Sequence, residues 1–400
     1  GRLYLGYFVY DPTTNELTKP DNNIILETKG VNPFNRYRKF DFGIYTNESK
    51  TRLYVIRQLK NTKSKEVTLK FFEFDQTLKQ LNTYENIIPV MGTNISYSSP
   101  TFNKNGEFYF TTKEKIKDKE DVNWVFNVYK LRSDASEAKR FELKNSKTNL
   151  LDFDIYKGSD GEIICAGYYY DSEEKGVFQF DLNSEEFNWF PMSGNKCKSW
   201  YSATEPFDSK TPFSFRRHII TGLKETGEND LLVFSEQRWM RTKVKTASDG
   251  TTKETNYYYR DSLYVSKLDL EGELVWTCII DKDQRSVNDE AMFSSYYSFS
   301  DNEHLYILFN DNKKFYTSNG DPVRKKRLED IKFQINRSFP DFLILVKINL
   351  ASGEVVQNAI YNNGIEKSQI LPATAFMSED KSSLYFSTKN KKLYNASLVA

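Results

Sequence analysis

Histidine, cysteine and long apolar runs are scarce or missing in this chain. Its 400 residues include 2 His and 3 Cys. His218 and His304 are too few for a His-rich metal site, and no CxxC or HxxxH spacing occurs, so we expect no metal. Cys165, Cys197 and Cys278 do not form a disulfide framework, although one bridge stays open. No apolar run approaches the roughly 20 residues that cross a bilayer, so we expect no transmembrane segment.

The sequence motifs of common catalytic sites are also missing. No GxGxxG or GxxxxGK[ST] loop is present to hold a nucleotide phosphate, and no GxSxG elbow presents a serine nucleophile. We therefore expect no cofactor and no catalytic residues. Paired carboxylates for glycoside hydrolysis stay open, because 55 Asp and Glu residues allow many spatial pairs. The two histidines are interpreted as structural residues.

The charges are nearly balanced. Lys and Arg number 56 against 55 Asp and Glu, a formal net charge of +1. A dedicated nucleic-acid binder carries a basic excess on one face, so we expect no nucleic-acid partner.

Aromatic residues, in contrast, are abundant. They make up 15% of the chain, with 26 Tyr and 30 Phe. These side chains favour pleated, half-buried surfaces, which indicates many strands. A chain of this length exceeds the usual size of one core, unless the core is distributed over repeats or a barrel.

One sequence pattern recurs along the chain: an apolar strand that ends in Asp or Asn, a short turn and a further strand. Alternating apolar residues predict strands with one buried face, and the Asp or Asn supports the turn through its side chain. The copies are Gly6–Lys19, Leu69–Leu81, Val128–Leu143, Val177–Phe190, Leu263–Ile280 and Leu343–Ile360.

Each copy follows a further pair of predicted strands. The second strand of each pair is predicted at Arg52–Leu59, Glu107–Thr112, Glu162–Tyr169, Asp230–Gln237, His304–Asn310 and Ser383–Thr388. The first strands are predicted at Ser98–Phe102, Leu151–Tyr156, Phe213–Ile220, Phe293–Phe299 and Ala373–Met377.

Four strands per repeat predict an all-β fold of the β-propeller class. The shorter two spacings between the turn residues match the roughly 40–50 residues of a propeller blade, and the longer two require insertions. Five complete units lie between about Phe40 and Tyr361. A sixth would combine C-terminal strands with a strand around Leu3–Tyr10, so that residues 1–400 form one closed domain without exposed sheet edges. We expect six four-stranded blades, with seven as the alternative. The rival architectures are a pair of β-sandwiches and an open antiparallel repeat.

Long insertions join the second strand of a unit to its third at Trp239–Tyr258 and Asp311–Pro340, and at Lys113–Asn123 in another unit. Connections between units are long at Thr83–Tyr97, Pro191–Pro212 and Asp281–Met292. In a propeller, the insertions within units and the connections between units emerge on the same face. We expect that face to be the binding face. Aromatic and Arg residues dominate protein interfaces. The predicted partner-binding residues are Trp200, Tyr201, Trp239, Arg241, Phe315, Tyr316 and Arg324.

The stretch from Tyr257 to Lys314 carries the motifs KLDLEGELVW, DKDQ and LFNDNKK. With the Asn, Lys and Tyr bias of the chain, it resembles the repeat region of uncharacterised exported β-propeller-like proteins of Bacteroidota. This resemblance implies a location in the cell envelope, as periplasm or outer surface, or outside the cell. It implies no catalytic residue.

Three functions are compatible with these observations. The first is a non-catalytic scaffold that docks a protein partner, or a larger envelope complex, through the loop-rich face. The alternative is a propeller that binds or processes carbohydrate, with Trp200, Tyr201 and Trp239 stacking on a glycan. The third is a structural subunit whose faces are buried in an assembly.

Overall fold

The computed structural model describes most of the chain as strands that form two compact units. One unit holds residues 1–144 with 160–163, and the other holds 145–159 with 164–400. The described residues are 2–11, 13–14, 16–19, 24–29, 42–46, 51–61, 66–89, 94–97, 101–105, 107–118, 121–131, 138–144, 149–170, 174–192, 197–199, 218–227, 230–269, 273–280, 282, 284–312, 341–362, 370–378, 383–387 and 393–397.

The first unit contains two larger antiparallel sheets and two short ribbons. The ribbons pair β1 (Arg2–Gly6) with β4 (Ile24–Lys29) and β2 (Val9–Asp11) with β3 (Glu16–Thr18). One sheet has the order β5 (Phe42–Thr46), β6 (Arg52–Asn61), β7 (Glu66–Asp75) and β8 (Gln80–Pro89). The other has β10 (Thr101–Phe102), β11 (Phe108–Asp118), β12 (Asp121–Leu131) and β13 (Ala138–Leu143), with β9 (Asn94–Tyr97) beside β11.

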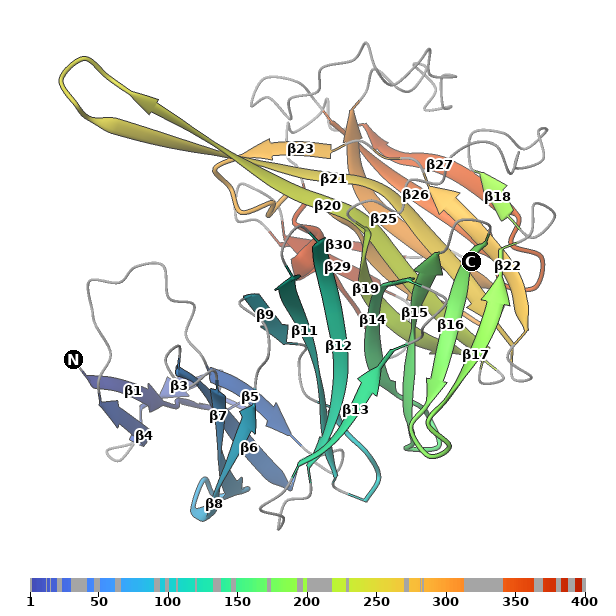
Figure 1. Ribbon diagram of the computed structural model, residues 1–400. Coiled ribbons are helices and arrows are strands. Elements are labelled where there is room, and N and C mark those ends of the chain that lie inside the picture. The colour runs from blue at the N-terminus through green and yellow to red at the C-terminus, as the bar shows by residue number, and fades with distance from the viewer. Residues whose placement is uncertain are drawn as a thin grey trace. The chain divides into compact units, whose positions relative to one another are not determined.

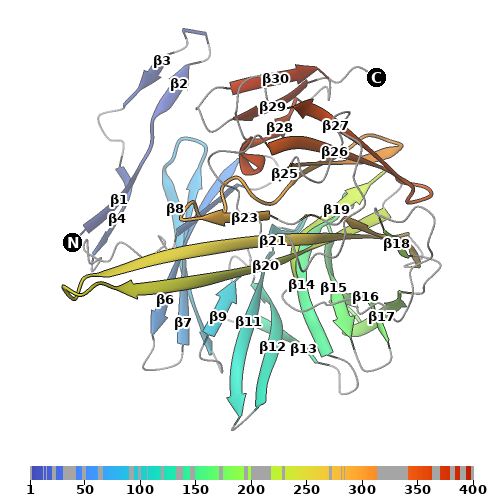
Figure 2. The ribbon, with the colours of Figure 1, turned by 90° about the horizontal axis from the view of Figure 1, so that it is seen from above.

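The second unit contains four sheets in chain order (Figures 1 and 2). The first has β14 (Asn149–Lys157), β15 (Ile163–Tyr170), β16 (Lys175–Asp181) and β17 (Glu186–Pro191). The next, called the arm sheet below, has β18 (Cys197–Ser199), β22 (Leu274–Ile280), β21 (Thr252–Leu268), β20 (Asp230–Thr246) and β19 (His218–Thr226), with β23 (Gln284–Val287) beside β21. The third has β24 (Tyr297–Ser300), β25 (His304–Asn312), β26 (Asp341–Asn349) and β27 (Val355–Asn362). The last has β28 (Phe376–Met377), β29 (Ser383–Ser387) and β30 (Leu393–Ser397).

The arm sheet is covered on both faces. On one side, Leu232, Val265 and Trp276 pack against residues of β25 and β26. On the other, Val233 and Tyr264 pack in a cluster with residues of β15 and β16. A sheet of a two-layer sandwich has only one packed face, so this part of the chain is a series of stacked sheets. The prediction of one buried face is therefore wrong for the central strands of this sheet. Both of their faces are buried, and their sequences are accordingly almost continuously apolar, as in Leu231–Phe234.

Serial stacking also orders the sheets of the first unit. Ile56 and Phe71 pack in one cluster with Phe108 and Tyr129 of the following sheet. All-β architecture with several four-stranded antiparallel sheets is thus confirmed. The described part of the chain includes one 3-10 turn, η3 (Pro372–Thr374), and holds no helix long and apolar enough to cross a membrane.

The predicted Asp and Asn turns are confirmed where the structure describes them. The Asp75 carboxylate accepts hydrogen bonds from the backbone N–H of Thr77 and of Lys79. Asp181, Asp269 and Asn349 accept in the same way from residues two to four positions further on. The predicted second strands match β6, β11, β15, β20, β25 and β29.

The predicted insertion Trp239–Tyr258 is not an irregular loop. β20 and β21 each run for 17 residues and pair from Arg238–Arg260 out to Thr246–Thr252. Figure 1 shows this hairpin, the arm, extending beyond the other strands of its sheet. Thr242, Val244 and Tyr258 are residue types with high strand propensity, which explains why the ribbon is continuous. The predicted insertion Lys113–Asn123 is likewise part of the β11–β12 hairpin.

Three further expectations are corrected. The predicted connection Asp281–Met292 contains β23, which adds a strand to the arm sheet. The first strand predicted at Phe293–Phe299 begins only at Tyr297. At Ala373–Met377 the strand is only Phe376–Met377, because Pro372 begins a 3-10 turn. Residues 313–340 of the insertion at 311–340 lie outside the described residues. Closure of residues 1–400 into one domain stays a prediction. The closing strand predicted around Leu3–Tyr10 overlaps β1, which pairs with β4.

Candidate functional site

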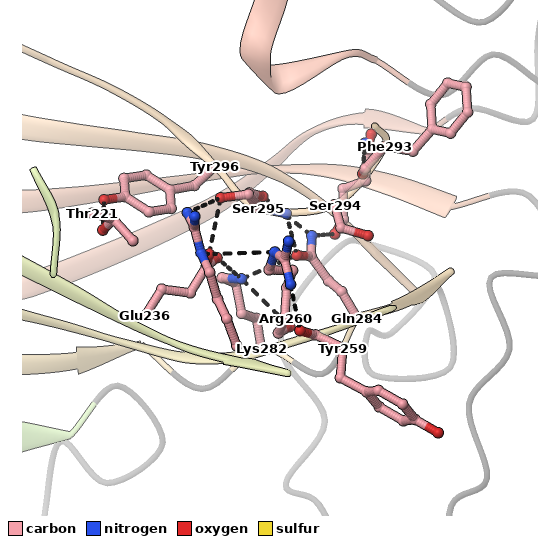
Figure 3. A network of polar contacts seen from close by, with 12 residues as sticks. Thr221, Glu236, Tyr259, Arg260, Lys282, Gln284, Phe293, Ser294, Ser295 and Tyr296 are labelled. Carbon is pink, nitrogen blue, oxygen red and sulfur yellow. Dashed lines mark hydrogen bonds and ion pairs between the residues drawn. The ribbon is translucent and has the colours of Figure 1, made fainter. Parts of the chain in front are cut away.

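A buried ion-pair network lies where the arm leaves its sheet (Figure 3). Its centre is Glu236 on β20, which is fully buried. One carboxylate oxygen binds the buried Lys282 ammonium. The other binds the Arg238 guanidinium, accepts a hydrogen bond from Ser295 Oγ at 3.0 Å and lies 3.9 Å from Nε of Arg260. Three cations thus surround one carboxylate.

An irregularity of the β20–β21 ladder brings these groups together. The pairing shifts between Glu236 and Arg238, so that Glu236 faces Leu263 while Arg238 faces Arg260. Two residues of β21 therefore oppose the single Gln237, the arrangement of a β-bulge. The bulge places Arg238 and Arg260 beside the carboxylate. We call this bulge with its ion pairs the arm root.

A second layer of hydrogen bonds ties the arm root to neighbouring backbone. Gln284 Oε1 accepts from Lys282 Nζ at 3.0 Å and from the backbone N–H of Ser295 at 2.7 Å. Gln284 Nε2 donates to the carbonyl of Asn310 at 2.7 Å. The Asn310 side chain donates to the carbonyl of Ile370 at 2.9 Å. The network therefore connects β20, β23 and β25.

The segment that supplies Ser295 has an unusual backbone. Asn288, Glu290, Ala291 and Ser295 all have positive φ, at 53°, 56°, 62° and 79°. Left-handed conformations are strained for residues other than glycine, and they persist where surrounding contacts hold the backbone in place. Here the Ser295 bonds to Glu236 and Gln284 hold the segment against the arm root.

The electrostatics favour an ionised carboxylate. Burial opposes ionisation, but Lys282 and Arg238 more than offset it and hold the pKa of Glu236 below its usual range. Burial lowers the pKa of Lys282, and Glu236 opposes that change. Burial and then Arg238 lower the pKa of Arg260. Burial raises the pKa of Tyr296, which hydrogen-bonds Thr221 at 2.5 Å. This arrangement is suited to fixing geometry, since Glu236 is inaccessible to a substrate.

Beyond the root, the arm has two chemically different faces. Cross-strand partners lie on the same face, and successive residues alternate between faces. One face is the basic face, formed by the pairs Trp239–Tyr259, Arg241–Tyr257, Lys243–Thr255 and Lys245–Lys253. It carries four cations and no acidic residue. Its charged side chains are exposed.

A column of stacked groups forms the inner end of the basic face. The rings of Trp239 and Tyr259 stack with centroids 4.6 Å apart and planes at 5°. The Arg285 guanidinium lies over the Tyr259 ring at 4.6 Å. Further out, Lys243 Nζ lies 5.3 Å from the Tyr257 ring. Aromatic stacking and cation–π contacts thus order this face.

The opposite face, called the neutral face below, carries the pairs Met240–Tyr258, Thr242–Asn256 and Val244–Glu254, and Glu254 is the one charged residue of these pairs. Met240 is 57% exposed and Val244 is 58% exposed. Both are large apolar side chains on the same strand and face. A single exposed apolar residue is ordinary, but two exposed apolar side chains on the same face of one strand are a candidate contact for a partner.

The two edges of the arm also differ. β23 pairs with β21 from Tyr257 to Arg260, and Asn288 exchanges hydrogen bonds with Asn256. The pairing of β19 with β20 ends at Gln237. Among the described residues, no strand pairs with the outer edge of β20 over 240–246.

His218, which the sequence analysis interprets as a structural residue, lies beside the arm root. It is buried, pairs with Gln237, hydrogen-bonds Ser235 at 3.0 Å and stacks on Tyr264. Burial lowers the pKa of His218 to about 3. His304 begins β25, and its Nδ1 lies 3.8 Å from Oδ1 of Asp301.

Of the predicted binding residues, Trp239 and Arg241 lie on the basic face of the arm. Trp200, Tyr201, Phe315, Tyr316 and Arg324 lie outside the described residues. The arm root was missed by sequence reasoning. Its signals were an acidic residue at the end of the apolar run Leu231–Phe234, and the DKDQ motif, which contains Lys282 and Gln284. In the described part of the chain, no group of three or more His, Cys, Asp or Glu side chains could hold a metal ion.

No protein-family model and no curated protein sequence matches this chain. Among solved structures, a variant of the apocarotenoid oxygenase of Synechocystis is similar at a TM-score of 0.34 and 8% identity, over 77% of this chain and 58% of the oxygenase. The chain thus spans little more than half the oxygenase. The β-propeller domain of the Trilobed protease from Pyrococcus furiosus is similar at a TM-score of 0.34 and 12% identity, over 86% of this chain and 78% of that domain. A mannose phosphorylase from Leishmania mexicana has a TM-score of 0.28 and 11% identity, over 68% of this chain and 81% of the enzyme.

Proposed function

We propose that this chain is a non-catalytic binding module that docks a protein partner through the β20–β21 arm. One observation carries the proposal: a buried ion-pair network anchors a hairpin whose exposed outer half has a basic face without acidic residues. Binding sites are commonly carried by surface segments that a rigid scaffold positions. The arm has both properties, and its root gives no substrate access to the buried carboxylate.

The side chains of the arm support a protein partner. Trp, Tyr and Arg are the residues that carry most of the binding energy at protein interfaces, and Met is enriched there. Trp239, Tyr257 and Arg241 lie together on the basic face, and Met240 lies on the neutral face. Pre-stacked rings lose little conformational entropy on binding, which favours affinity.

The architecture that we propose is a β-propeller of six four-stranded blades, with seven as the alternative. Serial stacking of consecutive antiparallel sheets supports it, because propeller blades pack in the same way. We propose a location in the bacterial envelope or outside the cell, on the resemblance to exported Bacteroidota proteins alone. The residues around Trp200 and Phe315 stay predicted contributors to the same binding face.

A shortened arm tests the docking function. Residues 239–259 are deleted and replaced by Asn-Gly, a two-residue turn that closes the ribbon at the Arg238–Arg260 pair. The arm root is left intact, so the fold should be retained. Capture of partners from an envelope extract should be lost with this variant. The matched control shortens the β11–β12 hairpin by replacing residues 117–122 with Asn-Gly, and should capture normally. Equal capture by both variants would remove the arm as the docking site.

Carbohydrate binding is the competing function. Of the three residues expected to stack on a glycan, only Trp239 lies among the described residues, and Tyr259 covers one face of its ring. A glycan array in which the intact chain binds sugar and the shortened-arm variant does not would favour carbohydrate over protein.

A further inference from the structure

We infer that the partner adds a β-strand to the outer edge of β20, and that this strand alternates acidic with apolar residues. The inference rests on the proposed docking function of the arm and specifies how docking occurs. Three observations carry it: the edge of β20, the charge of the basic face and the apolar pair on the neutral face.

The edge supplies the backbone contacts. A strand paired on only one side presents a row of N–H and C=O groups that can pair with another chain. In the described structure the outer edge of β20 from 240 to 246 has no strand beside it, while β23 and Asn288 occupy the opposite edge of the arm, along β21 near the root. The arm therefore offers β20 as the receiving strand.

The two faces specify the side chains of the added strand. Arg241, Lys243 and Lys245 project from β20 on the basic face at every second residue, a spacing of about 7 Å. A strand laid beside β20 has the same two-residue repeat, so acidic residues at alternate positions would each face one cation. Its intervening residues fall on the neutral face, next to Met240 and Val244, where apolar side chains would cover two exposed apolar groups.

The same charges disfavour a second copy of this chain. Two β20 edges paired with each other would place the cations of both copies on one face, and like charges in cross-strand contact are destabilising. Lysines on an edge strand commonly prevent such self-pairing. An acidic strand from another protein reverses the sign of this interaction, which makes the edge selective.

A pair of matched variants tests strand addition. The probe is a synthetic peptide of about ten residues in which glutamate alternates with valine. Lys243→Glu changes a cation on β20, directly beside the added strand, whereas Lys253→Glu makes the same change on β21, one strand further away, on the same face. Strand addition predicts that Lys243→Glu weakens peptide binding about tenfold and Lys253→Glu about twofold or less. A peptide that alternates lysine with valine should bind better to Lys243→Glu than to the parent chain.

Hydrogen exchange supplies a readout specific to backbone pairing. The alternating peptide should slow amide exchange within 240–246 and leave 252–255 unchanged. A peptide of the same composition with glutamates and valines in separate blocks should not slow exchange within 240–246. If both peptides bind the intact arm equally, or if both Lys variants weaken binding equally without amide protection, strand addition is wrong and docking through the arm stands. If the shortened-arm variant binds the alternating peptide as well as the parent does, the proposed docking function is wrong too. A dimer in sedimentation that the peptide dissociates would assign the edge to a second copy and overturn the inference.

Discussion

The root and the outer half of the arm are parts of one hairpin with opposite chemistry. At the root, Glu236 and Lys282 are buried and charged, and each has specific partners. Further out, Arg241, Lys243 and Lys245 are exposed. Buried charges are costly to break but fix geometry, whereas exposed charges add little stability and are available to a partner. The comparison indicates that the hairpin separates positioning from binding along its length.

The largest effect is expected from breaking the arm root. Glu236→Gln leaves Lys282, Arg238 and Arg260 without their carboxylate and should lower the free energy of unfolding by about 3–5 kcal/mol. Urea denaturation measures this change. Glu254→Gln, on the exposed part of β21, is the matched control and should change stability by about 0.5 kcal/mol or less. Similar losses in the two variants would contradict the contrast between root and outer arm.

Acid should weaken the root through His218. Its pKa in the folded chain is about 3, against an ordinary 6.5. The unfolded chain therefore binds a proton first as the pH falls through 6.5, and stability is lost between about pH 6.5 and about pH 3. From pH 7 to pH 5 the loss attributable to this residue is about 2 kcal/mol. Urea denaturation at the two pH values should show a smaller acid-induced loss in His218→Gln. An unchanged loss would show that His218 is not the titrating group.

The smallest effect is expected from the stacked column between root and outer arm. Trp239→Ala removes the contact with Tyr259 and should cost about 1 kcal/mol of stability, because an aromatic pair contributes about that much beyond its buried area. Trp239→Phe retains a ring and should cost less. Denaturation midpoints of the two variants provide the measurement. Equal midpoints for Trp239→Ala and the parent would show that the stacking of Trp239 on Tyr259 does not stabilise the folded chain.

Much of the fold could be predicted from the sequence. The second strands of the repeats and the Asp and Asn turns follow from local alternation and from turn chemistry. Burial of both faces of Leu231–Phe234 could not be read locally, because it depends on which sheets stack on the strand. The arm was predicted as an insertion, although Thr242, Val244 and Tyr258 signal a strand.

The sequence pointed to part of the arm. Trp239 and Arg241 were named because aromatic and Arg residues mark interfaces, and their role in binding stays a prediction. Glu236 and Lys282 are 46 residues apart in sequence, and only the sheet pairing and the β-bulge bring them together. No local pattern records that contact.

Residue-resolved hydrogen exchange along β20 in the native chain tests the central claim most directly. We expect protection to be highest at 231–236, to remain measurable across the bulge at Glu236 and Arg238, and to decrease toward Thr246 as an ordered ribbon with one open edge. In Glu236→Gln, the protection beyond the bulge should decrease most. Exchange at Glu236 and Arg238 as fast as at Thr246 in the parent chain would contradict an anchored arm.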